Sequence, residues 1–110
     1  MKYEKHQLEN IHKNLLYCKP CTEIDKFRVD HNESLEHNLA LARQFVILSY
    51  EGFCIAIRPQ LRNKERPDLL VLSTKKPIAK EVMITESDKQ FAAKNYLGIN
   101  KIKVNGKNEN

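Results

Sequence analysis

Two acidic residues lie beside or inside apolar stretches of the chain, where a carboxylate is least expected. Asp68 follows Pro67 and comes directly before the apolar run Leu69 to Leu72. Glu81 lies within a second apolar run, Ile78 to Ile84. A carboxylate in such a setting is costly to bury unless a cationic side chain or a metal ion compensates its charge. Two such acids on neighbouring strands would share one Mg²⁺, or Mn²⁺ in its place, and thereby activate a water for hydrolysis.

A group of basic residues precedes the acid pair. It consists of Arg58, Arg62, Lys64 and Arg66, in a chain whose formal net charge is +5. Positive charge beside a metal site is suited to contacting phosphates, so this group favours a nucleic acid as the partner. The alternative interpretation is that the charge serves solubility alone.

The acids require a hairpin to position them. The two apolar runs are joined by the polar segment Ser73 to Pro77, which predicts two neighbouring strands around a turn. A third buried strand is predicted over Phe53 to Arg58, between Gly52 and Pro59. Ile99 to Val104 alternates between apolar residues and lysines, which predicts a last strand with one wet side.

Three amphipathic helices are predicted around these strands. They cover Tyr3 to Tyr17, a segment from Asn32 that ends at Gly52, and a segment from Ser87 that stops at Gly98. Residues 22–31 are expected to form a short extended piece. A helix between the strand of Glu81 and the last strand implies that those two strands are parallel. The predicted fold class is therefore α/β (α+β), with a mixed central sheet of about four strands flanked by helices.

The hairpin resembles the core of the PD-(D/E)xK nuclease superfamily, which has the restriction-endonuclease-like fold and includes archaeal Holliday-junction resolvases. Pro67-Asp68 matches the PD pair and Glu81 matches the second acid. Within the superfamily, the chain is most similar in sequence to the branch that contains competence CoiA-like proteins. The similar segments are Glu33 to His37, Arg66-Pro67-Asp68 and Ile78 to Met83.

This resemblance implies a Mg²⁺-dependent or Mn²⁺-dependent DNA endonuclease that works as a homodimer, with Asp68 and Glu81 as metal ligands. A glutamate on the helix before the sheet often completes the metal site in resolvase-like relatives. Glu36 is the first choice for that glutamate and Glu33 the reserve. His37 occupies the position of a histidine in the CoiA-like branch, and we expect it to contribute to nucleic-acid binding.

One residue departs from the superfamily pattern. The lysine of the motif, two residues after the second acid, is replaced by Met83, which carries no charge. Another cation could take its place: Lys89 or Lys94 from the following helix, or Lys80 if a bulge turns the strand. Alternatively, the protein has lost strong catalysis and uses the fold to bind nucleic acid or a protein partner.

Length and composition predict one folded domain. The 110 residues are 41% hydrophobic and 30% charged, with few glycines and prolines. We expect an N-terminal helix and CxxC segment over residues 1–31, the nuclease-like core over 32–104, and a polar tail over 105–110. No signal peptide or membrane span is apparent, which predicts a cytoplasmic protein.

Cys18 and Cys21 form a CxxC pair that three chemistries would suit. With His6 and His12, the two thiolates could bind zinc. The pair could also be redox-active or form a disulfide, although plain free thiols are the main expectation. Cys54 lies in an apolar run and is expected to pack in the core.

Overall fold

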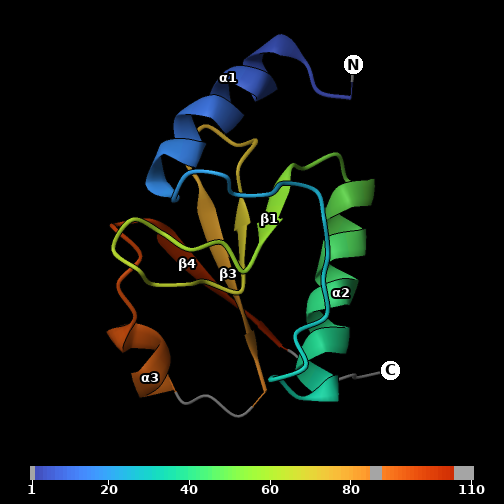
Figure 1. Ribbon diagram of the computed structural model, residues 1–110, viewed down its shortest axis with the longest axis vertical. Helices are drawn as coiled ribbons and strands as arrows, with labels where there is room; N and C mark the ends of the chain where they lie inside the picture. The colour runs from blue at the N-terminus through green and yellow to red at the C-terminus, as the bar shows by residue number, and fades with distance from the viewer. Residues whose placement is uncertain (1, 85–87, 106–110) are drawn as a thin grey trace.

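The computed structural model describes residues 2–84 and 88–105. Figure 1 shows a central sheet with α2 along its right side, α1 at the top and α3 at the lower left. In chain order the elements are α1 (Lys5–Asn14), the short 3-10 helix η1 (Leu15–Tyr17), α2 (Leu35–Tyr50), β1 (Ile55–Ile57), β2 (Leu69–Val71), β3 (Ile78–Met83), α3 (Asp88–Ala93) and β4 (Asn100–Asn105). This arrangement confirms the predicted α/β class.

The four strands form one mixed sheet in the order β1-β2-β3-β4. The pairs β1/β2 and β2/β3 are antiparallel, whereas β3/β4 is parallel, as the intervening helix predicted. In the β2/β3 ladder, Leu69 lies opposite Lys80. One step beyond this pair, Asp68 comes level with Glu81, and opposite residues of an antiparallel ladder project to the same face.

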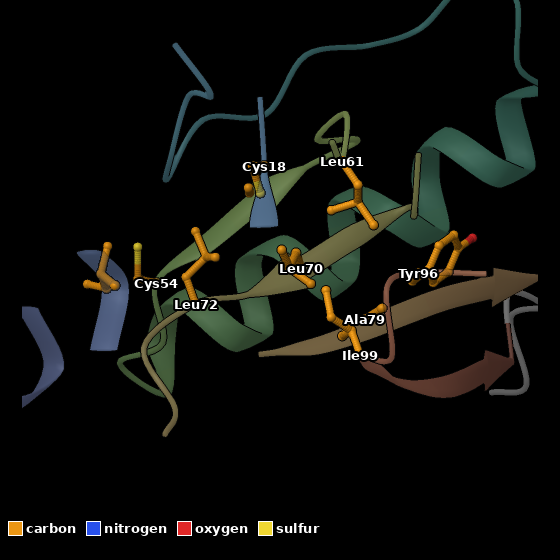
Figure 2. Packing of buried hydrophobic residues seen from close by; sticks show 10 residues of the cluster. Cys18, Cys54, Leu61, Leu70, Leu72, Ala79, Tyr96 and Ile99 are labelled. Carbon is orange, nitrogen blue, oxygen red and sulfur yellow. The ribbon is translucent and has the colours of Figure 1, made fainter. Parts of the chain in front are cut away.

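Each face of the sheet has its own apolar core. On one face, Leu70, Leu72 and Ala79 pack with Ile11 of α1 and with Tyr96 (Figure 2). On the other face, Leu69, Val71 and Val82 pack with Leu41 and Leu48 of α2. Because side chains alternate along a strand, Asp68 and Glu81 lie on the face of Leu70 and Ala79, which is the face of the first core.

The start and end of α2 follow local sequence signals. Ser34 is the N-cap, and its hydroxyl accepts a hydrogen bond from the His37 N–H at 3.1 Å. Gly52 follows the helix with φ of 91°, a left-handed conformation that favours glycine and was the expected stop. This cap fixes Glu33 just outside the helix and His37 one turn inside it.

Three sequence-based expectations need correction. Residues 22–31 are irregular rather than a strand, with Asp25 in a left-handed conformation while its N–H donates to the Ile55 carbonyl. The last helix ends at Ala93, well before Gly98, and the Lys101 amine donates to the carbonyls of Phe91 and Lys94 at this end. Ile102, expected on a covered side of β4, is 44% exposed. The proposed cap at Ser87 lies outside the described residues.

Within the described ranges, no helix combines the length and the apolar character needed to cross a bilayer.

Candidate metal and catalytic site

Asp68 and Glu81 are joined by crossed hydrogen bonds at the end of the β2/β3 ladder. The Asp68 N–H donates to Glu81 Oε2 at 2.7 Å, and the Val82 N–H donates to Asp68 Oδ2 at 2.7 Å. Each carboxylate therefore satisfies a backbone donor on the opposite strand, in place of a carbonyl of the regular ladder. The structure thus brings the two predicted acids together.

Glu81 is buried and already has a cationic partner. Glu81 is 1% exposed. Its Oε1 accepts hydrogen bonds from the Lys94 amine at 2.6 Å and from the Tyr96 hydroxyl at 2.8 Å. Figure 2 shows the Tyr96 ring in the core, with its oxygen directed away from the other side chains of the cluster. Burial of the Glu81 charge is therefore compensated by Lys94, which follows the last residue of α3.

The other two lysines considered for the place of the motif lysine lie elsewhere. Lys89 is exposed on α3, and Lys80 points to the opposite face of β3 from Glu81 because the strand is regular there. Met83 is half-buried on the same side of the strand as Glu81. Lys94 is accordingly the cation that the fold places beside the acid pair.

A second carboxylate and an imidazole approach Asp68 from the start of α2. Candidate ligand atoms of Glu33, His37 and Asp68 all lie within 4.8 Å of one another. His37 Nε2 is 3.4 Å from Asp68 Oδ2, and His37 Nδ1 is 3.2 Å from Glu33 Oε1. Among the described residues, this is the one group of three or more such side chains that is compact enough to hold a metal ion.

Arg58 holds Glu33 in this position. Its Nε donates to Glu33 Oε1 at 2.7 Å, and its other nitrogens donate to the Arg28 carbonyl at 2.7 Å and to Asn38 Oδ1 at 2.9 Å. The Arg58 side chain is only 12% exposed. Arg58 therefore positions a carboxylate, and its guanidinium is not open to a phosphate as the sequence had suggested.

The electrostatics of the group favour a cation. Burial, and then the negative charge of Glu81, raises the pKa of Asp68 to about 6, with Glu33 adding a smaller effect in the same direction. The Val82 N–H and His37 oppose this rise but do not cancel it. Above this pKa, three carboxylates carry charge in a small volume, and a bound divalent ion would relieve their repulsion.

The donor set fits a divalent metal. Two carboxylates and one imidazole converge on an open pocket of about 400 Å³, which is lined by Glu33, Ser34, His37, Asp68, Val82, Ile84 and Lys94. His37 Nδ1 is buried and, although near Glu33, makes no aligned hydrogen bond to any described residue. A nitrogen in this state is suited to coordinate an ion.

Glu81 does not line this pocket, and both its oxygens are engaged by protein groups. The expected ligand pair Asp68 and Glu81 is therefore better described as Asp68 in the pocket and Glu81 behind it.

The remaining predicted residues are spread around this centre. Glu36 is exposed on the first turn of α2 and outside the group, whereas the reserve candidate Glu33 is within it. Lys64 and Arg66 are exposed, and the Arg62 Nε donates to the Leu16 carbonyl at 2.5 Å. These three basic residues remain candidates for phosphate contacts.

The CxxC segment does not gather a four-ligand site. Cys18 is buried, Cys21 is exposed, and all three cysteines are free. His6 and His12 are exposed on α1, and within the described residues neither they nor the cysteines belong to a group of three or more metal ligands. Cys54 is fully buried in the core, as predicted.

Sequence reasoning missed two residues of the site. They are Tyr96 and Asn38, neither of which the sequence assigned to the site. Asn38 is 7% exposed; its amide nitrogen donates to the Asp30 carbonyl, and its Oδ1 accepts from the Asp30 N–H as well as from Arg58. An asparagine among the apolar positions of a predicted helix was the available signal, because a buried amide needs specific partners.

Comparison of the chain with known protein families, with curated proteins and with solved structures finds no match.

Proposed function

We propose that this protein is a divalent-metal-dependent DNA endonuclease of the PD-(D/E)xK type. The observation that carries the proposal is the convergence of Glu33, His37 and Asp68 beside the buried ion pair of Glu81 and Lys94. Two acids facing across a hairpin, a third acid just before the N-cap of α2 and a nearby lysine form the set of groups that this chemistry requires.

The residues have distinct roles in this proposal. Asp68 and Glu33 bind the ion through carboxylate oxygens, and His37 supplies a nitrogen ligand. The bound ion supplies polarisation of a phosphoryl oxygen and a lowered pKa for an attacking water. Lys94 lines the pocket and offsets negative charge that develops on the phosphate, while Glu81, which also accepts from the Tyr96 hydroxyl, fixes its position.

The ligand types also predict a metal preference. Mg²⁺ strongly favours oxygen ligands, whereas Mn²⁺ accepts a mixture of oxygen and imidazole nitrogen. Because His37 stands between the two carboxylates, we expect higher activity with Mn²⁺ than with Mg²⁺.

Cleavage assays test the proposal directly. The purified protein is incubated with duplex, branched and single-stranded DNA in Mn²⁺, next to the variants Asp68→Asn and Glu33→Gln. We expect each variant to lose at least about a hundredfold in rate, because each removes a charged ligand. Glu36→Gln is the matched control, since it changes an exposed acid on the first turn of the same helix. Cleavage that survives Asp68→Asn would refute the proposed site.

A second function has its own supporting observations. Met83 replaces the motif lysine, and Arg58 already pairs with Glu33 at 2.6 Å, so part of the negative charge of the pocket is compensated without an ion. These features favour a protein that binds nucleic acid and does not cut it. Such a protein would retain DNA at low salt and release it as salt rises, with no cleavage in any divalent metal.

A further inference from the structure

A groove with a mostly apolar lining lies directly beside the Asp68 pocket. Its volume is about 380 Å³, and its apolar lining consists of Phe27, Val29, Leu35, Leu39 and Ala42. Leu35 and Leu39 are 73% and 60% exposed, so this lining is open to a ligand. Glu33 lines both this groove, which we call the α2 groove, and the Asp68 pocket, and the two hollows are therefore neighbours.

The aromatic wall of the α2 groove is fixed by the same residue that holds the metal ligand Glu33. Arg58 Nε donates to Glu33 Oε1 at 2.7 Å, and the guanidinium carbon of Arg58 lies 5.8 Å from the centre of the Phe27 ring. The Phe45 ring packs against Phe27, with 5.9 Å between the ring centres. Because two neighbours already hold Phe27 in place, little further ordering is required when a ligand packs against it.

Few polar groups accompany the apolar lining. Glu33 and Asn38 are engaged by Arg58, and the Asn38 amide also donates to the Asp30 carbonyl. His31, the third polar residue of the lining, is exposed, and its imidazole makes no hydrogen bond or ion pair within the described residues. An apolar hollow with one uncommitted polar group is typical of sites for small organic ligands, and a nucleobase has the matching combination of flat faces and polar edges.

The size and place of the α2 groove suit a base of the strand that the Asp68 pocket would bind. An apolar cavity of about 150 Å³ holds a benzene ring, so this groove has room for a purine. In a nucleic acid, a single sugar joins each base to its phosphates. A phosphate in the Asp68 pocket therefore brings an adjoining base to the α2 groove, across Glu33.

We propose that the α2 groove binds an unpaired base next to the phosphate held in the Asp68 pocket. The inference rests on the proposed role of that pocket, and it adds a class of substrate: single strands, flaps and branch points. Bases of a continuous duplex are stacked and paired, and they reach such a groove only after unstacking. Packing against an apolar and aromatic lining accepts every base, so the preference is for unpaired structure and not for sequence.

Methyl chemical shifts of Val29, Leu35 and Leu39 test the groove without phosphate or metal. In a chelator, millimolar deoxyadenosine should shift these signals, whereas deoxyribose, the matched probe without a base, should not. The methyl groups of Leu16, which is 66% exposed on η1, are the reference. No shift with deoxyadenosine, or equal shifts at Leu16, would overturn the proposal. Shifts that appear when the protein concentration alone rises would overturn it as well, because a second copy would then occupy the groove.

Binding of single strands tests the groove with a longer ligand. In a chelator, we expect the natural chain to bind a single-stranded oligonucleotide at least about tenfold more tightly than an abasic chain of the same length. Leu39→Gln and Val29→Ser should each remove most of this difference, because they place polar groups in the lining from α2 and from segment 22–31. Ile47→Gln is the matched control, since Ile47 is 44% exposed on α2 and outside the groove. Equal affinities for the two strands, or equal effects of Leu39→Gln and Ile47→Gln, would overturn the proposal.

Cleavage in Mn²⁺ separates this inference from the proposed nuclease activity. Base-dependent binding with no cleavage in any divalent metal would support the groove and refute the nuclease. Cleavage that Asp68→Asn abolishes, but that proceeds as fast on continuous duplex as on single strands, would support the nuclease and overturn the base site.

Discussion

At the scale of single residues, the Asp68 carboxyl makes folding stability depend on pH. Its pKa is about 6 in the folded protein, compared with an ordinary value of 3.8. Between about pH 4 and pH 6 the folded protein therefore binds more protons than the unfolded chain. The contribution of Asp68 to the free energy of unfolding should consequently fall as pH rises through this window and then level off.

Asp68→Asn tests this dependence by urea unfolding in a metal chelator. The variant should lose the decline between about pH 4 and pH 6 and gain about 2 kcal/mol over the natural chain at pH 7.5. Its amide oxygen can still accept the hydrogen bond from the Val82 N–H. Glu9→Gln on the exposed side of α1 is the control and should keep the natural profile. If the free energy of unfolding changes by the same amount across this window in the natural chain and in Asp68→Asn, then Asp68 ionises normally.

Lys94 should matter for stability as well as for any chemistry. Lys94→Met leaves the buried Glu81 without its cation, so we expect a loss of about 2 kcal/mol in the free energy of unfolding. Lys89→Met, which changes an exposed lysine of α3, should cost little. Adding Glu81→Gln to Lys94→Met should restore much of the loss, because a neutral amide needs no cation. No recovery in the double variant would mean that Lys94 acts mainly through packing.

The proximity of Asp68 and Glu81 could be predicted from the sequence, because two apolar runs around a short turn place their members opposite one another. The identity of their neighbours could not. Glu33 rather than Glu36 lies beside Asp68 because the helix begins after Ser34, and helix boundaries depend on a cap that several residues could have provided. Arg58 contacts Glu33 from a left-handed backbone position, with φ of 47°, a conformation that the sequence around an arginine does not indicate.

At the scale of elements, Lys101 ties β4 to the end of α3. Its amine donates to the carbonyls of Phe91 and Lys94 at 2.8 and 2.7 Å and lies 4.9 Å from the centre of the Phe91 ring. Lys101→Met removes this cap, so we expect a loss of about 1 kcal/mol and faster amide exchange in residues 91–97. Hydrogen exchange measured by mass spectrometry would detect the change.

Lys103→Met provides the comparison for that measurement. Lys103 also lies on β4 and pairs with Asp88, but both side chains are substantially exposed. Its replacement should change the free energy of unfolding by less than about 0.5 kcal/mol. If amide exchange in residues 91–97 is equally fast in Lys101→Met and Lys103→Met, the end of α3 is held by contacts other than the Lys101 cap.

Most helices and strands could be predicted from the spacing of apolar residues and from the residues that favour turns and helix ends. The parallel β3/β4 pair was predictable because a helix separates the two strands, and the antiparallel β2/β3 pair because a short turn joins them. The irregular segment 22–31 was not, because its backbone is fixed by distant partners such as the Ile55 carbonyl rather than by its own residues. The contact of Lys101 with the end of α3 likewise joins two elements and has no local signal in the helix itself.

At the scale of the whole molecule, the net charge of +5 should make the DNA binding that we propose depend on salt. Under the proposed function, Lys64 and Arg66 lie on the exposed loop that leads into Asp68 and contact phosphates. Replacing both by glutamine should lower the slope of log affinity against log salt by about 2, since each phosphate contact releases counterions. Binding is measured in a chelator, so that no cleavage intervenes.

The control for the salt experiment is Lys5→Gln with Lys13→Gln, which removes the same charge from exposed positions on α1. If the slope falls equally in both double variants, the chain attracts DNA through its overall charge and not through the loop before Asp68.

The crossed hydrogen bonds of Asp68 and Glu81 have a consequence for how this chain tolerates mutation. Asparagine and glutamine can accept the same backbone N–H groups, whereas apolar residues cannot. In a library sorted only for abundance of folded protein, positions 68 and 81 should admit acids and amides alike. Sorted instead for DNA cleavage, the library should retain acids alone. The difference between the two surviving sets would separate what these side chains do for architecture from what they do for chemistry.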